Sequence, residues 1–416
     1  MPANSEGATR SLPEHPNLRH LKDQAKDLFN AGKTKSLTDA QFKIARMYGF
    51  VSWSKLRAHI ETLEETGALK QAIDTNDFER VRVLMSNNPG LHRAPLGYNQ
   101  NGPLTWVAEC RIPWERPGRV RLAMAQWMID HGSNVHQGGD GPLMRAALFG
   151  DRIPMMELLV ASDADVNAEW NGYFPIIFSP CETVDPVALQ WLLDHGANPN
   201  CARPARKYPG TALDYVIQSY SRNQELATCI DILLGAGATT KYNVPAVFDL
   251  LRNRLDLVAK HLDADPALVH RRFGELDFGT TAMRRLVLEG GTLLHVAAEY
   301  CNPDAARLLL DRGAGVNARA EVNDAGVGGQ TPIFHSASQF GDKGLEVTRL
   351  LLDHGADATI RAKLPGQHDD PSDFVEGTAL AYASRFPGED ESHAGRLANR
   401  KTTGLLRKNM PFVSES

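Results

Sequence analysis

Three carboxylates in this sequence could do chemistry: Glu275 and Asp277, in a long insertion, and Glu299, in the repeat that the insertion enters. Cleavage of a glycosidic bond uses two carboxylates roughly 5 to 10 Å apart on either side of the bond. One hypothesis is therefore a hydrolase, specifically a glycoside hydrolase, with Glu299 and a second carboxylate, Asp277 or Glu275, as acid and base.

Aromatic residues could supply the rest of such a site. Flat apolar sugar faces pack well on aromatic rings, and Trp170, Tyr173 and Tyr300 are candidates for a sugar platform. The sequence contains no His-Glu-x-x-His, Walker or Gly-x-Ser-x-Gly motif, and each of these motifs would have indicated a different chemistry. We expect no metal and no cofactor.

Charge and composition argue against nucleic-acid and membrane partners. The 416 residues carry a formal net charge of −5, which argues against nucleic acid because nucleic-acid binding needs clustered basic residues. The five cysteines are odd in number and form no Cys-x-x-Cys pair, which favours a reducing compartment. No run approaches the roughly 18 apolar residues of a membrane span. The sequence thus predicts a cytoplasmic protein without a membrane partner.

The candidate residues are positioned by a recurring unit, of which residues 291–320 are the clearest copy. Thr292 can cap a first helix, Ala297 and Ala298 allow another helix to approach closely, and residues 308–310 supply an apolar second helix. One helix pair of this size cannot bury both of its apolar faces. Similar units must therefore stack on either side.

The same features return along the chain, for example in Thr331-Pro332-Ile333 and in His354-Gly355-Ala356-Asp357. The Thr-Pro-Leu-His-like start, the Ala-Ala step and the Gly-Ala-Asp turn resemble the ankyrin repeat, and the period near 33 residues agrees. The resemblance implies an all-α solenoid of about nine helix pairs over residues 67–410. Ankyrin arrays are mostly binding scaffolds, so the resemblance implies binding without fixing the partner.

A separate module precedes the array. Residues 1–16 lack periodicity and are expected to form a disordered tail, whereas residues 17–66 show helical apolar spacing. This module should cap the exposed apolar face of the first repeat. It also looks like a module that often precedes bacterial ankyrin arrays, because of the pattern from Ala45 to Trp53. This resemblance suggests a bacterial source.

Several units are longer than the minimal repeat, and the extra residues fall mostly between one unit's second helix and the next unit's first helix. Long ordered loops are uncommon unless they have a function. We expect these hairpin or loop fingers to fold over the concave groove and shape a pocket. The insertions are 112–119, 168–174, 203–209, 271–290, 319–330 and 361–376.

The resemblance also implies that residues after the Ala-Ala step point into the concave groove. Adjacent helices pack about 8 to 10 Å apart, so groove carboxylates in different units need a finger residue to complete a pair. The predicted ligand-binding residues of the groove and fingers are Glu109, Trp170, Tyr173, Glu182, Tyr300, His335 and Gln339.

Two functions follow from these features. The first is an ankyrin-repeat binding protein that holds a protein or a small molecule, such as a carbohydrate, in its groove. The alternative is the hydrolase. A binding protein should show an open groove with exposed apolar residues, whereas a hydrolase should show a closed pocket where carboxylates and aromatic rings converge.

Overall fold

The computed structural model describes residues 10–13, 16–96, 101–109, 118–201, 210–218, 224–242, 244–279, 284–366, 370, 372–385 and 399–410. Its contacts divide the chain into two compact units. Unit 1 comprises residues 1–146 and 154–165, and unit 2 comprises residues 147–153 and 166–416. The predicted tail at 1–16 and the predicted fingers at 112–119 and 203–209 fall largely outside the described residues.

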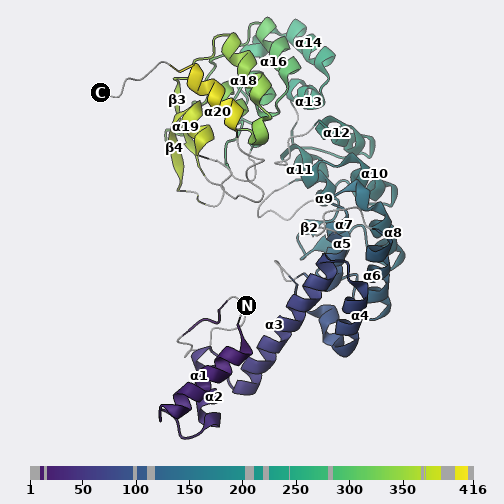
Figure 1. Cartoon of the computed structure of the whole chain (residues 1–416). Coiled ribbons are helices and arrows are strands. Elements are labelled where there is room, and N and C mark those ends of the chain that lie inside the picture. The colour runs from purple at the N-terminus through teal and green to yellow at the C-terminus, as the bar shows by residue number, and fades with distance from the viewer. Residues whose placement is uncertain are drawn as a thin grey trace. The chain divides into compact units, whose positions relative to one another are not determined.

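Unit 1 is built from helices (Figure 1). Ser36 and Ser52 begin the second and third of these helices, and their hydroxyls accept hydrogen bonds from the backbone N–H groups of Asp39 and Lys55. The elements are α1 (Leu18–Asn30), α2 (Leu37–Met47), α3 (Trp53–Asp74), α4 (Phe78–Asn87), η1 (Pro89–Arg93), α5 (Pro103–Glu109), α6 (Arg119–Asp130), α7 (Gly141–Ala146) and α8 (Ile153–Ala161), whose first residue belongs to unit 2.

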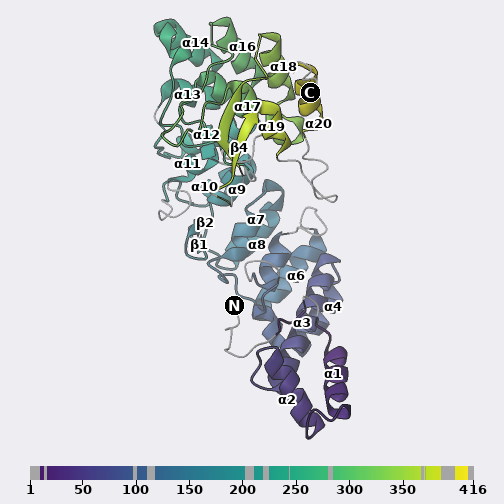
Figure 2. The same ribbon diagram turned by 90° about the vertical axis from the view of Figure 1, so that its left-hand side faces the viewer.

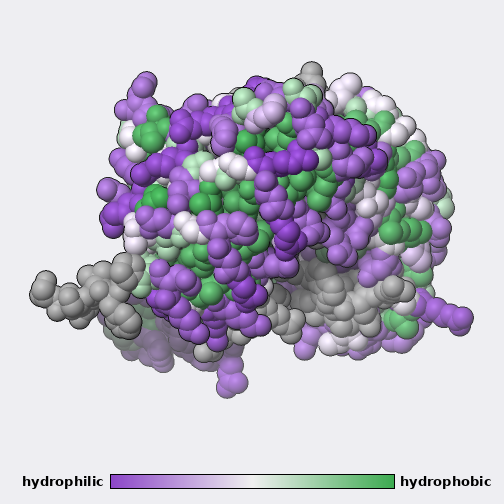
Figure 3. Space-filling view, turned by 90° about the horizontal axis from the view of Figure 1, so that it is seen from above, coloured by the Kyte–Doolittle hydropathy of each residue, from purple (hydrophilic) through white to green (hydrophobic). Residues whose placement is uncertain are grey.

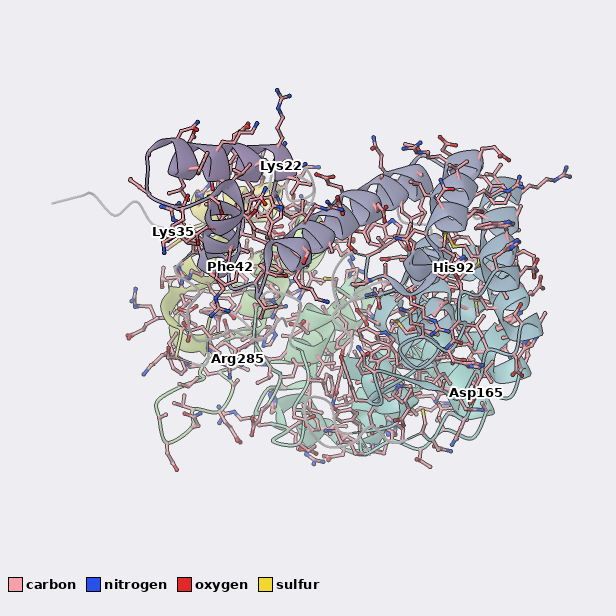
Figure 4. The ribbon with its side chains drawn as sticks, turned by 90° about the horizontal axis from the view of Figure 1, so that it is seen from below. Lys22, Lys35, Phe42, His92, Asp165 and Arg285 are labelled. Carbon is pink, nitrogen blue, oxygen red and sulfur yellow. The ribbon has the colours of Figure 1, made fainter. Side chains whose placement is uncertain are left out.

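The first three helices share an apolar core of their own. Seven buried residues fill it: Leu21, Ala25, Ala40, Ile44, Ala45, Leu56 and Ile60. Helix α3 continues through the predicted boundary between residues 66 and 67, and its later residues Leu69, Ala72 and Ile73 are also buried. One long helix therefore belongs both to the N-terminal module and to the helix pair with α4. Figure 4 labels Lys22 and Phe42, on α1 and α2 of this module.

Unit 2 continues with further helix pairs and two short hairpins. Its helices are η3 (Gly150–Arg152), α9 (Phe178–Thr183), α10 (Pro186–Asp194), α11 (Ala212–Gln218), α12 (Leu226–Gly235), α13 (Pro245–Leu251), α14 (Leu255–Ala264), η4 (Pro266–His270), α15 (Leu293–Glu299), α16 (Pro303–Asp311), α17 (Pro332–Ala337), η5 (Phe340–Asp342), α18 (Leu345–Asp353), α19 (Ala379–Ser384) and α20 (Arg400–Lys408).

The helices of unit 2 stack in two rows. The shorter helices α13, α15, α17 and α19 contact one another in that order, and we call them the inner helices. The longer helices α14, α16, α18 and α20 contact one another in a second row, where Figure 2 shows α14, α16 and α18 side by side. Small residues such as Ala297, Ala298 and Ala337 are fully buried, because the inner helices approach closely at these positions.

Short strands form at two of the insertions, where hairpin or loop fingers were predicted. The insertion near residue 170 is a hairpin of β1 (Glu169–Trp170) and β2 (Phe174–Pro175), and the last insertion is a longer hairpin of β3 (Arg361–Pro365) and β4 (Phe374–Thr378). The structure is thus mostly helical, with antiparallel hairpins at insertions.

The surface agrees with the charged composition. Figure 3 shows a face that is mainly hydrophilic, with hydrophobic residues in small groups between the polar ones. Across the described part of the chain, no helix combines the length and apolar character needed to cross a membrane.

Candidate functional site

Three inserted segments of unit 2 join into one structure, which we call the finger layer. It consists of the described parts of residues 271–291, 319–330 and 361–378. Backbone hydrogen bonds link each segment internally and to the next: Phe273 N–H to Gly291 O (2.9 Å), Glu321 N–H to Gly290 O (3.2 Å), Ala320 N–H to Gln330 O (2.8 Å) and Gly328 N–H to Lys363 O (2.8 Å). The insertions therefore support one another.

Glycine at position 328 makes this contact possible. Its φ is +125°, and a Cβ there would lie 2.1 Å from the carbonyl oxygen of Glu321. No other residue could adopt this backbone geometry in the same space. Gly328 thus lets the backbone of the middle finger approach both Glu321 and Lys363 closely.

Beneath the finger layer lies a buried ion pair. Arg284 Nη2 donates to both carboxylate oxygens of Glu299, at 2.9 and 3.0 Å. His335 Nδ1 donates to Glu299 Oε2 at 2.8 Å, since a carboxylate can only accept. All three side chains are 0 % exposed. We call these three residues the buried charge cluster.

The buried charge cluster joins three elements. Glu299 is the last residue of the inner helix α15, His335 belongs to the next inner helix α17, and Arg284 comes from the first finger. Glu299 does not face an open groove, because the finger covers it. Its carboxylate holds the finger against the ends of two inner helices, and a ligand could reach it only if the finger moved.

His295 lies beside this cluster and is neutral. Its Nδ1 accepts the backbone N–H of Thr292 at 3.0 Å, which leaves Nε2 to donate to the carbonyl of Gln330 at 3.1 Å. Burial, helped by the neighbouring His335, lowers the pKa of His295 to about 3. The histidine ties the start of α15 to the second finger, so it stabilises the structure.

The other two candidate acids lie at the edge of the finger layer. Asp277 is 55 % exposed and forms an ion pair with Lys241 at 2.6 Å. It also accepts a hydrogen bond from the Tyr242 hydroxyl at 2.6 Å, and burial together with this bond raises the pKa of Tyr242. Glu275 pairs with Arg271 at 3.3 Å. The three predicted catalytic residues are thus each engaged by basic partners at separate places.

Of the predicted aromatic platform, two residues lie together. The Trp170 and Tyr173 ring centroids are 5.9 Å apart at the β1–β2 hairpin, where Trp170 is buried and Tyr173 is exposed. Glu182 lies close to the same aromatic group, because its Oε2 accepts from the Tyr215 hydroxyl at 3.4 Å and Tyr215 packs on Phe174.

Tyr300, the third predicted aromatic residue, packs against the finger layer. Its ring centroid lies 6.2 Å from that of Phe278, and its hydroxyl donates to the carbonyl of Ile217 at 2.7 Å. Tyr300 therefore fixes the position of the first finger relative to α11 and α15.

The remaining predicted ligand residues are buried. Gln339 donates from its side chain to the carbonyl of His335 at 2.9 Å, and both residues are almost fully enclosed. Glu109, in unit 1, is buried at the end of α5 and lies 3.9 Å from Arg145 of α7. The side chains of Gln339 and Glu109 therefore contact neighbouring residues within the stacked helices and stabilise them.

A groove of about 480 Å³ opens within the finger layer, and we call it the finger groove. All three fingers contribute to it, and both charged and apolar side chains line it. The lining residues are Arg285, Leu286, Val287, Glu289, Glu321, Val322, Asn323, Val327, Gly328, Gln330, Leu364 and Pro365.

A second cavity of about 500 Å³ lies beside Tyr300. Cys301, Asn302 and Lys343 also line it, and the carboxylates Glu299, Asp277 and Glu275 are not among its lining residues. Within the described residues, no group of three or more His, Cys, Asp or Glu side chains could hold a metal ion. The described cavities therefore do not bring the predicted acid and base together.

Comparison with known families bears on the stacked helix pairs. A family model for ankyrin repeats, in three copies, matches residues 253–362. The chain therefore contains ankyrin repeats over these residues. The match covers the helix pairs α15/α16 and α17/α18 together with the first two fingers. No curated protein matches the chain.

Ankyrin repeats generally mediate protein–protein interaction, which agrees with a binding role.

Sequence analysis identified Glu299 and His335, whose side chains lie 2.8 Å apart in the structure, but it missed Arg284, Arg285 and Gln330. These residues lie in insertions, where no repeat consensus indicates which way a side chain points. Only the rule that a groove carboxylate needs a partner from a finger could have found Arg284.

Proposed function

We propose that this ankyrin-repeat protein binds a protein partner, and that a segment of the partner enters the finger groove. The observation that carries the proposal is the convergence of three separate insertions on one groove of about 480 Å³. Each insertion lengthens the minimal repeat, and all three contribute residues to the same groove. A single binding site therefore accounts for all three insertions. Ordered insertions on a repeat scaffold are where binding residues concentrate.

The groove also has an exposed apolar edge. Val322, in the second finger, is 57 % exposed, and it lines the groove with Val327 and Pro365. Exposed and half-buried apolar residues at a groove favour binding because a ligand removes their surface from water. A protein segment with apolar side chains would fit this chemistry.

We extend the ankyrin array beyond the matched residues on the same grounds. Helix pairs such as α5/α6 and α19/α20 have the short and long members seen in the matched range. The proposed array runs over residues 67–410 in about nine pairs, with residues 17–66 as its cap. A bacterial, cytoplasmic setting, a carbohydrate ligand and the hydrolase stay predictions from the sequence.

Val322→Arg tests the proposed function. A displayed library of random dodecapeptides is selected against the full chain, and enriched peptides are synthesised with a fluorophore for anisotropy measurements. We expect Val322→Arg to weaken their binding about 10-fold or more, since a charged side chain then occupies the groove edge.

Val83→Arg is the matched control, because Val83 is 49 % exposed on α4 in unit 1. It should leave peptide binding unchanged. Failure to enrich any peptide, or equal loss in both variants, would refute the proposal.

A further inference from the structure

The finger groove has a basic end and an acidic end, and this polarity indicates what kind of segment it takes. Arg285 marks one end, where its backbone N–H donates to the carbonyl of Gly366 after β3 (Figure 4). Glu289 and Glu321 mark the other end. They are close because the Glu321 N–H donates to the carbonyl of Gly290, the residue after Glu289.

The basic end has capacity for a ligand. Arg285 Nη1 is shielded from solvent and, among the described residues, has no hydrogen-bond partner. Asp370 interacts with Arg285 through charge but without a hydrogen bond. Its Oδ1 accepts instead from the Ser372 hydroxyl at 2.6 Å and from the Ser372 N–H at 2.9 Å. A guanidinium nitrogen left in this state favours an incoming carboxylate.

The acidic end is equally open. Glu289 and Glu321 are both exposed, and within the described residues neither forms an ion pair. Two neighbouring carboxylates repel each other and any anion, whereas they attract a cationic side chain. A phosphate-rich ligand is disfavoured at this end.

Between the ends lies an apolar floor with one polar acceptor. Leu286 and Leu364 line the groove and are nearly fully buried, whereas the neighbouring Val287 and Pro365 are half-buried and leave apolar surface accessible. Gln330 also lines it and is only 3 % exposed. Its Nε2 donates to the carbonyl of Val287 at 3.3 Å, whereas its Oε1 has no partner in the described structure. A buried acceptor in this position calls for a donor from the ligand.

Resting on the proposed function, we propose that the partner enters the finger groove as an extended peptide segment with opposite charges at its two ends. An acidic side chain meets Arg285, a lysine or arginine meets Glu289 and Glu321, and apolar residues lie between them. A backbone N–H of the segment donates to Gln330 Oε1.

The spacing of the two charges follows from the chain itself. Arg285 and Glu289 are four residues apart, and extended backbone rises about 3.3 Å per residue. The two ends are thus at most roughly 13 Å apart. An extended partner segment spans this distance when its acidic and its basic residue are about four positions apart, in either chain direction.

The peptides enriched on the full chain test this inference. We expect them to carry an acidic and a basic residue separated by about three to five positions. Arg285→Gln and the pair Glu289→Gln with Glu321→Gln should each weaken binding about 3- to 10-fold. The matched controls are Glu346→Gln and Arg349→Gln, at exposed positions on α18, and should leave affinity unchanged.

A double-substitution cycle identifies the contact. Replacing the peptide's acidic residue by its amide should weaken binding to the wild type but not to Arg285→Gln. If Val322→Arg abolishes binding and the charge variants do not change it, the proposed function holds and the polarity of the ligand is wrong. If Val322→Arg and the charge variants all leave binding unchanged, both proposals are wrong.

Discussion

The same pair of repeat positions carries charge in both units, but the counter-charge comes from different places. Glu109 and Glu299 each end the first helix of a pair, six residues after its first residue. Arg145 and His335 stand three positions after the proline at the start of the next first helix. In unit 1 the carboxylate meets Arg145 at 3.9 Å, and in unit 2 it meets His335 at 2.8 Å.

The two units differ in which segment of the chain supplies the cation. The repeat itself supplies Arg145 in unit 1, whereas in unit 2 the guanidinium of Arg284 arrives from an inserted finger. A buried carboxylate needs a positive partner because water cannot solvate it. Unit 2 therefore makes the folding of its helices depend on the placement of its finger, and the predictions below test this dependence.

The largest effect is expected from Arg284→Met. The substitution removes the guanidinium partner of the buried Glu299 carboxylate and leaves its hydrogen bond with His335. Breaking a buried ion pair in this way costs about 3 to 5 kcal/mol of local stability. Hydrogen exchange of α15 and α17 amides in low concentrations of urea measures the loss. Arg312→Met is the control, because Arg312 and Asp263 form an exposed pair, and it should cost less than about 1 kcal/mol.

A rescue variant sharpens the comparison. Adding His335→Arg to Arg284→Met places the cation where unit 1 has Arg145. If the two arrangements are equivalent, the double variant should regain about half of the lost stability or more. A double variant no more stable than Arg284→Met alone would show that the finger cannot be replaced by the repeat position.

Low pH should destabilise unit 2 through His295. The equivalent repeat positions in unit 1 are Thr105 and Met144, which do not titrate in this range. The pKa of His295 is lowered to about 3, while in the unfolded chain it is near the usual 6.5. The unfolded state therefore binds more protons between these values. His295 costs no stability above about pH 6.5, and stability falls as the pH drops from there towards about 3, by up to roughly 1.4 kcal/mol per pH unit.

His295→Gln tests this sign. The variant should be less stable than the wild type at pH 7, because it loses the histidine's bonds, but its urea-unfolding midpoint should fall less between pH 7 and pH 4.5. His354→Gln, at an exposed position, should keep the wild-type pH dependence. An unchanged slope in His295→Gln would contradict the assignment.

Sequence analysis predicted the parts of this structure that repeat. The helix pairs around Ala297 and Ala298 follow from periodicity, and so does the placement of Glu299 and His335 on neighbouring first helices. Sequence analysis expected a finger carboxylate, Asp277 or Glu275, to pair with Glu299, whereas the finger residue that contacts Glu299 is Arg284. The buried Glu299 carboxylate requires a positive partner. In a loop without sequence periodicity, however, the sequence does not indicate which residue points towards that carboxylate.

The smallest effect is expected at Asp277, which lies in the same finger as Arg284 but at its solvent-facing edge. Its ion pair with Lys241 is half exposed, so water already solvates both charges and Asp277→Asn should cost about 0.2 to 1 kcal/mol. The amide still accepts the hydrogen bond from Tyr242, and 0.5 M NaCl should remove most of the difference. A loss as large as that of Arg284→Met would mean that the edge, and not the buried charge cluster, attaches the finger to the array.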